Sequence, residues 1–138
     1  MTVDVRGPRF SAWVTSAVLA VALLTASGVL VAVQAAVFAV GAFAGLRYAP
    51  YGVLFRRVVA PRLGPVRERE PEAPARFAQL VGFVFAVVGA AGFLLGAPVV
   101  GFVATGLALV AALLNAATGF CLGCEFYLTA RRALPART

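Results

Sequence analysis

The sequence predicts an all-α integral membrane protein in which four transmembrane helices form a bundle of two hairpins. Of its 138 residues, 62% are apolar and 12% are charged, whereas soluble domains are about 45–50% apolar and about 25% charged. Two long segments carry no charge: 37 residues between Arg9 and Arg47, and 48 residues between Arg76 and Glu125. A helix crosses the hydrocarbon core with roughly 20 residues. Each uncharged segment therefore has room for two crossings joined by a tight turn.

Turn signals inside the two uncharged segments define the four spans. Ser27 and Gly28 separate the first two, and Gly96, Ala97 and Pro98 separate the last two. Lipid cannot satisfy the polar groups of an open sheet edge, so each span is predicted to be helical despite its many valines. The whole chain, residues 1–138, is interpreted as one membrane domain. The predicted spans are residues 10–26, 29–46, 77–95 and 99–120.

The charged residues predict how this bundle is oriented. All twelve basic residues are arginines, and the head (1–9), the middle loop (47–76) and the tail (121–138) carry +1, +4 and +2 of the net charge of +7. Four spans place these three segments on one side. Short basic loops stay cytoplasmic, so both termini and the middle loop are expected there. Because the arginines follow the span ends, nucleic acid is not predicted as a partner.

Two segments outside the spans mix apolar and basic residues, which is typical of helices lying in the membrane interface. They are residues 51–60 in the middle loop and residues 125–134 in the tail. Residues 65–74, rich in proline, arginine and glutamate, are predicted to be a solvated linker. Four arginines of the interfacial segments are expected to contact anionic lipid headgroups: Arg56, Arg57, Arg131 and Arg132.

Small and polar residues indicate how the spans pack. Glycines four residues apart let helix backbones approach closely, and such pairs are Gly41 and Gly45, Gly92 and Gly96, and Gly119 and Gly123. The polar residues predicted to lie within the spans are Gln34, Thr105 and Asn115. We expect them to bond neighbouring helices, with a solute path as the alternative. No ionisable residue lies within the spans away from their ends, which argues against a proton pump or a charge-coupled transporter.

The two hairpins have similar flanks. Arg9-Phe10 precedes the first and Arg76-Phe77 precedes the second, and an arginine pair followed by a proline comes after each. Both hairpins would start on the same side of the membrane, so a duplication would be a parallel repeat. The alternative is that any two membrane hairpins share such flanks.

The only group of residues that suggests a reactive site is the pair Cys121 and Cys124, the only cysteines of the chain. It follows the fourth span, and Glu125 stands directly beside it. In a helix, positions i and i+3 share a face with alpha carbons about 5–6 Å apart, within reach of a disulfide. The start of a new helix would favour a thiolate, whereas the Glu125 carboxylate would oppose it. In the reducing cytoplasm such a disulfide would be transient.

Three interpretations of the cysteine pair remain open. The first is a site of thiol–disulfide exchange with a partner. The second is half of a metal site, which a homodimer could complete because structural zinc takes four ligands. The third is two small residues packed at a helix end. No cofactor is predicted, and the chain has no histidine to ligate haem or metal.

Two motifs lie near the ends of the chain: Arg6-Gly7-Pro8-Arg9-Phe10 and Gly119-Phe120-Cys121-Leu122-Gly123-Cys124-Glu125-Phe126-Tyr127. They resemble the corresponding segments of a family of small bacterial four-span membrane proteins, domain of unknown function 4395, and the resemblance covers residues 6–132. Members are often encoded near thioredoxin-like proteins and rhodanese-type sulfurtransferases. This implies a role in thiol or sulfane-sulfur exchange at the bacterial plasma membrane, with Cys121 and Cys124 as the paired cysteines.

A looser similarity links the chain to quinone-linked thiol oxidases of the vitamin K epoxide reductase type, which are also four-helix bundles with a cysteine pair at a helix end. The chain lacks a second cysteine pair to relay electrons, and its pair is predicted to face the cytoplasm. Both departures argue against quinone reduction.

The sequence thus predicts a multi-pass protein of the bacterial plasma membrane with both termini cytoplasmic. Cys121 and Cys124, flanked by Glu125 and Tyr127, are expected to exchange thiols or sulfane sulfur with a thioredoxin-like or rhodanese-like protein. The alternatives are a non-enzymatic membrane scaffold, a dimeric cysteine-based metal site, and a small-solute permease lined by Gln34, Thr105 or Asn115.

Overall fold

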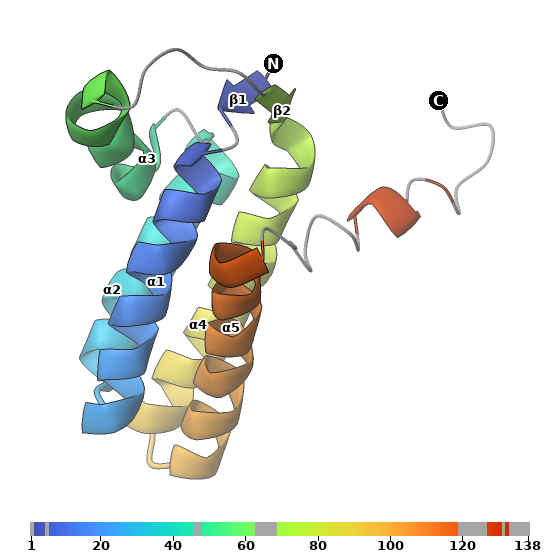
Figure 1. Cartoon of the computed structure of the whole chain (residues 1–138). Coiled ribbons are helices and arrows are strands. Elements are labelled where there is room, and N and C mark those ends of the chain that lie inside the picture. Colours follow the sequence, from blue (N-terminus) through green and yellow to red (C-terminus); the bar gives the residue numbers. More distant parts are fainter. Residues whose placement is uncertain are drawn as a thin grey trace.

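Four long helices lie side by side in the computed structural model, which describes residues 2–4, 6–45, 48–62, 69–118, 127–130 and 132 (Figure 1). Around the bundle, α1 packs against α2, α2 against α4, α4 against α5, and α5 against α1. The helices are α1 (Arg6–Thr25), α2 (Gly28–Ala39) with its π-helical continuation η1 (Val40–Ala44), α4 (Glu72–Leu94) and α5 (Pro98–Thr118).

Both hairpin turns lie where the sequence predicts them. After α1, Ala26 adopts φ 49°, and the Ser27 side chain caps α2 by accepting a hydrogen bond from the Leu30 N–H at 3.1 Å. After α4, Gly96 adopts φ 86°, a left-handed conformation that glycine tolerates. Pro98 then opens α5, where its missing N–H has no cost.

The helices α1 and α4 begin at Arg6 and Glu72, before the apolar spans that start at residues 10 and 77. A helix can continue into polar surroundings, so an apolar boundary does not mark a helix end. By length and composition, two helices in the described ranges are able to cross a membrane: Ala75–Leu94 and Pro98–Ala117. The other two apolar helices are shorter, Arg9–Thr25 and Gly28–Ala44.

Glycines in α4 and in η1 make room for larger side chains of the facing helix, which brings α2 and α4 close together. A methyl group added at Gly82 would lie 2.7 Å from the Phe38 ring, and one added at Gly41 would lie 2.8 Å from Gln79 Oε1. Gly41 thus makes room for a side chain of α4, whereas the prediction for it was a close approach of helix backbones. The buried core between the helices consists of Ala22, Val31, Ala35, Phe38, Ala86 and Ala90.

The other predicted interface glycines divide into two kinds. Gly92 packs against the backbone of Gly101 in α5, as expected. Gly96 instead follows a helix end with φ 86°, and a methyl group added there would meet nothing within 4 Å, so its interpretation as an interface residue is wrong. Gly45 also follows a helix end, with φ 112°, and is buried. Spacing alone cannot separate a packing glycine from one that ends a helix. The pair Gly119 and Gly123 lies outside the described residues.

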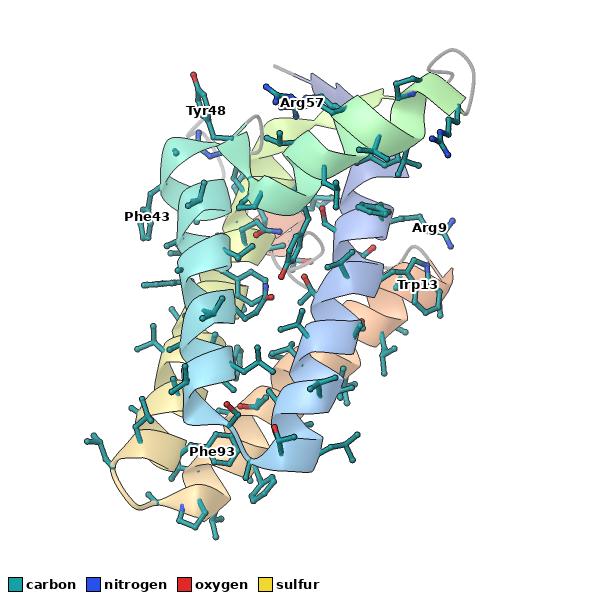
Figure 2. The ribbon with its side chains drawn as sticks, turned by 90° about the vertical axis from the view of Figure 1, so that its left-hand side faces the viewer. Arg9, Trp13, Phe43, Tyr48, Arg57 and Phe93 are labelled. Carbon is teal, nitrogen blue, oxygen red and sulfur yellow. The ribbon has the colours of Figure 1, made fainter. Side chains whose placement is uncertain are left out.

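A short helical segment covers one end of the bundle, as the sequence predicts for residues 51–60 (Figure 2). It consists of α3 (Pro50–Leu54), the π-helical turn η3 (Phe55–Val59) and the 3-10 turn η4 (Ala60–Arg62), and it packs on α1. Phe55 is buried, and its ring centroid lies 5.7 Å from that of Phe10. We call this end of the molecule the loop end.

Two strands at the loop end were not expected from the sequence. β1 (Thr2–Asp4) pairs antiparallel with β2 (Arg69–Pro71), with Val3 opposite Glu70. The prediction of a solvated linker over residues 65–74 is therefore wrong for β2 and for the start of α4. A three-residue pair gives too short a pattern for periodicity to reveal. This pairing holds the start of the chain beside the middle loop, and the hairpin turns lie at the opposite end (Figure 1).

Candidate functional site

The predicted cysteine site has to be located from its flanks. Cys121, Cys124 and Glu125 lie outside the described residues, and so does Arg131. The described chain ends at Thr118 of α5 and resumes at Tyr127, in a helical segment of residues 127–130. Both flanks make contacts that fix their place in the bundle.

The first flank is held by an arginine from another helix. Arg9 Nη2 of α1 donates a hydrogen bond to the backbone oxygen of Ala116 at 3.1 Å. Ala116 lies in the last turn of α5, where carbonyl groups have no partner within the helix and carry partial negative charge. The guanidinium therefore caps α5. In the sequence, Cys121 follows Ala116 by five residues.

The second flank returns to the same end of the bundle. The ring of Tyr127 lies against that of Phe77, near the start of α4, with a centroid distance of 5.7 Å and an interplanar angle of 48°. Tyr127 was predicted only as a neighbour of the cysteine site. Both flanks of the cysteine pair therefore lie at the loop end, beside the starts of α1 and α4.

Arg76 of α4 repeats the arrangement of Arg9 on the other hairpin. Its Nε and Nη2 donate to the Ala42 oxygen at 3.2 and 2.9 Å, and Nη2 also lies 3.3 Å from the Phe43 oxygen. These carbonyls belong to η1, the last turn of the α2 helix. Each hairpin thus begins with an arginine that caps the final helix of the other hairpin.

The predicted polar residues occupy different environments within the bundle. Gln34 is fully buried, and its Oε1 accepts a hydrogen bond from Tyr51 Oη of α3 at 2.7 Å. Burial raises the pKa of the Tyr51 phenol. Thr105 is also fully buried, on α5. Asn115 is half-buried, one residue before the carbonyl that Arg9 caps.

Among the predicted headgroup-binding arginines, Arg56 and Arg57 of η3 and Arg132 are exposed. Figure 2 shows Arg57 and Tyr48 at the loop end. This places basic side chains at the end of the bundle where the cysteine flanks lie, in keeping with the predicted clustering of charge.

Sequence reasoning missed three residues that organise this end. Tyr51 was taken as part of an interfacial helix, although it reaches into the bundle, because an aromatic residue beside arginines is also typical of headgroup contact. Arg9 and Arg76 were noted as flanks of the hairpins, but capping of a helix by a residue distant in the sequence leaves no local signal. The shared Arg-Phe dipeptides were the one available hint.

Comparison with curated proteins and with solved structures found no match. The model of the family described as domain of unknown function (DUF4395) matches residues 3–132. That match covers both hairpins, the middle loop and the segment with the cysteine pair. The chain therefore belongs to the DUF4395 family.

Proposed function

We propose that the protein crosses the bacterial plasma membrane four times and exchanges thiols or sulfane sulfur through Cys121 and Cys124 on its cytoplasmic side. The observation that carries this proposal is the position of both flanks of the cysteine pair. They lie at the loop end, together with the start of the chain, the middle loop and the exposed arginines.

Exposed apolar surface supports the four crossings. In an 18-residue apolar stretch of each of the helices Ala75–Leu94 and Pro98–Ala117 only 22% of the residues are buried, whereas a helix in the core of a soluble protein is mostly buried. The shorter helices also turn large side chains outward, including Trp13 (53% exposed) and Phe43 (64% exposed) (Figure 2). Soluble proteins rarely expose contiguous apolar surface of this extent.

The lengths of the shorter helices are compatible with this topology. Arg9–Thr25 and Gly28–Ala44 each contain 17 residues, the lower limit for a spanning helix. They run beside two longer apolar helices in the same bundle. If the longer helices cross the bilayer, the shorter ones are immersed beside them.

The distribution of charge supports the orientation. The arginines of α1, η3, η4 and α4 lie at the loop end, and the two hairpin turns at the other end carry no charge. Short basic loops are retained in the cytoplasm. The cysteine pair would then face the thiol systems of the cell interior.

The proposed exchange runs in two steps. One thiolate of the pair attacks a disulfide of a thioredoxin-like partner, which forms a mixed disulfide and releases one partner thiolate. The second thiolate attacks the first cysteine's sulfur, which releases the other partner thiolate and leaves Cys121 and Cys124 joined. Two electrons pass to the partner. With a rhodanese-like partner, a thiolate takes the sulfane sulfur as a persulfide and the partner leaves as a thiolate.

Trapping tests the exchange. Cys124→Ser and, separately, Cys121→Ser are expressed in the membrane, and covalent adducts are sought on gels run without reductant. We expect one variant to accumulate a reductant-sensitive adduct with a thioredoxin-like protein, because the resolving thiol is missing. The double variant is the control and should form none. Absence of such an adduct from both single variants would contradict disulfide exchange.

A further inference from the structure

Two fully buried polar atoms lack a hydrogen-bond partner among the described residues: Gln34 Nε2 and Thr105 Oγ1. Two hydroxyls of α1 bond instead to their own backbone, since Ser16 Oγ donates to the Ala12 oxygen at 2.7 Å and Thr25 Oγ1 to the Val21 oxygen at 2.8 Å. Buried polar groups are almost always paired, because an unpaired one loses its bonds to water without replacement. These two atoms therefore point to a ligand.

The two residues lie near the same level of the bundle. The Thr105 hydroxyl of α5 packs directly on Gly89 of α4, and Val31 Cγ1 of α2 lies 3.5 Å from the position of a methyl group added at Gly89. Three helices thus meet at Gly89. Gln34 follows Val31 by three residues, which is about 4.5 Å along the helix axis toward the loop end.

A third polar group connects this level with the loop end. Tyr51 belongs to the segment that covers the loop end, and its hydroxyl reaches Gln34 Oε1 at 2.7 Å. From the loop end inward, the order of polar groups is therefore Tyr51, Gln34 and Thr105. Within the described part of the four helices, the ionisable side chains stand near the loop end, at the starts of α1 and α4. A charged ligand at Gln34 would have no counter-charge.

We propose that Gln34 and Thr105 bind water inside the bundle and that Tyr51 closes this site toward the loop end. Water is uncharged, accepts a hydrogen bond from the amide Nε2, and both donates to and accepts from a hydroxyl. The site does not involve the cysteine pair, so a result that refutes this proposal leaves the thiol-exchange proposal unaffected, and the reverse also holds.

Nuclear magnetic resonance of the whole protein in lipid nanodiscs tests the site. The chain contains two glutamines, Gln34 and Gln79, so labelling with ¹⁵N-glutamine gives two side-chain amide groups, each with a pair of proton signals, and Gln79→Met assigns them. We expect a cross-peak between bound water and the Gln34 amide. The isosteric Thr105→Val should abolish or weaken it, and Thr105→Ser, which keeps the hydroxyl, should retain it. Thr25→Val, at an exposed hydroxyl, is the matched control and should leave it unchanged.

The closing role of Tyr51 has its own measurement. Tyr51→Phe removes one neutral hydrogen bond, and we expect the Gln34 amide protons to exchange with solvent about fivefold faster. Tyr48→Phe, at an exposed tyrosine of the same loop, should leave that rate unchanged. The site is refuted if Gln34 shows no water cross-peak, or if Thr105→Val leaves the cross-peak intact. An unchanged exchange rate in Tyr51→Phe overturns the closing role.

Discussion

Single glycines decide how closely the helices of this bundle approach, and Gly89 is one of the tightest contacts. A side chain there would collide with the Thr105 hydroxyl. We expect Gly89→Ala to lower the free energy of unfolding by about 1–3 kcal/mol, the usual effect of overpacking, as measured by thermal unfolding in detergent. Shortening the partner in Gly89→Ala/Thr105→Ala should restore much of the loss.

Gly106 provides the matched control for that experiment. It lies on the same helix as Thr105, and a methyl group added there meets nothing within 4 Å. Gly106→Ala should be neutral or stabilising by about 0.5–1 kcal/mol, because glycine weakens a helix interior. Equal destabilisation by both substitutions would show that the loss at Gly89 does not come from the contact with Thr105.

Tyr51 gives the protein a stability that depends on pH. Burial raises its pKa above the ordinary value of 10.0, so the folded protein holds the phenol proton more tightly than the unfolded chain does. The contribution is complete below pH 10 and is lost as pH rises through the folded-state pKa. We expect the free energy of unfolding to fall with pH above 10, and to fall less steeply in Tyr51→Phe. An unchanged slope would contradict this assignment.

At the scale of elements, the capping arginines join the two hairpins. Arg76 donates to two carbonyls of η1, whereas Arg9 donates to one of α5. Loss of a charged donor at a helix C-terminus is expected to cost about 1 kcal/mol in Arg9→Gln and roughly twice that in Arg76→Gln. Chemical unfolding of the purified protein measures both.

The same two variants separate a structural role from an effect on the cysteines. The Arg9 guanidinium lies at the helix end that precedes Cys121 in the sequence, and positive charge favours a thiolate. Arg9→Gln should therefore slow alkylation of the cysteine pair near neutral pH, whereas Arg76→Gln should not. If both variants slow alkylation equally, the effect comes from lost stability alone.

The elements could be predicted unevenly from the sequence. The helical regions can be predicted from the length of the uncharged segments, and both turns from the glycine, serine and proline residues that interrupt them. These signals are local in the sequence. Helix ends do not, because α1 and α4 continue beyond the apolar residues. The β1–β2 pair depends on two segments that are far apart in the sequence. Gln34 and Thr105 could be named from polarity, but the Tyr51 hydrogen bond required the placement of α3.

At the scale of the whole molecule, the proposed topology predicts where labels react. In a chain with both cysteines changed to serine, Thr2→Cys, Ala26→Cys and Ala97→Cys are treated with a membrane-impermeant maleimide. We expect Ala26→Cys and Ala97→Cys to react in cells with an intact plasma membrane, and Thr2→Cys to react only after that membrane is opened. Reaction of Ala26→Cys and Ala97→Cys from opposite sides would exclude the four-span arrangement.

The cysteine site could be proposed from the sequence because both residues lie in one short motif. The placement of its two flanks at the loop end rests on Arg9 with Ala116 and on Phe77 with Tyr127, pairs that join distant parts of the chain. Local patterns cannot report such pairs. The arrangement of the bundle is likewise a property of the whole chain, since α1 closes the ring by packing on α5, the last of the four helices.

The exchange of arginines between hairpins has a consequence for biosynthesis. When the first hairpin leaves the ribosome, Arg76 has not yet been synthesised, so the carbonyls of Ala42 and Phe43 lack their guanidinium donor. Arg9 lacks its acceptor for longer, because Ala116 is made later still. The first two helices therefore cannot complete their tertiary contacts before the second hairpin is made. In the proposed membrane topology, a nascent chain arrested within the middle loop would expose an incompletely folded hairpin to the quality-control proteases of the membrane.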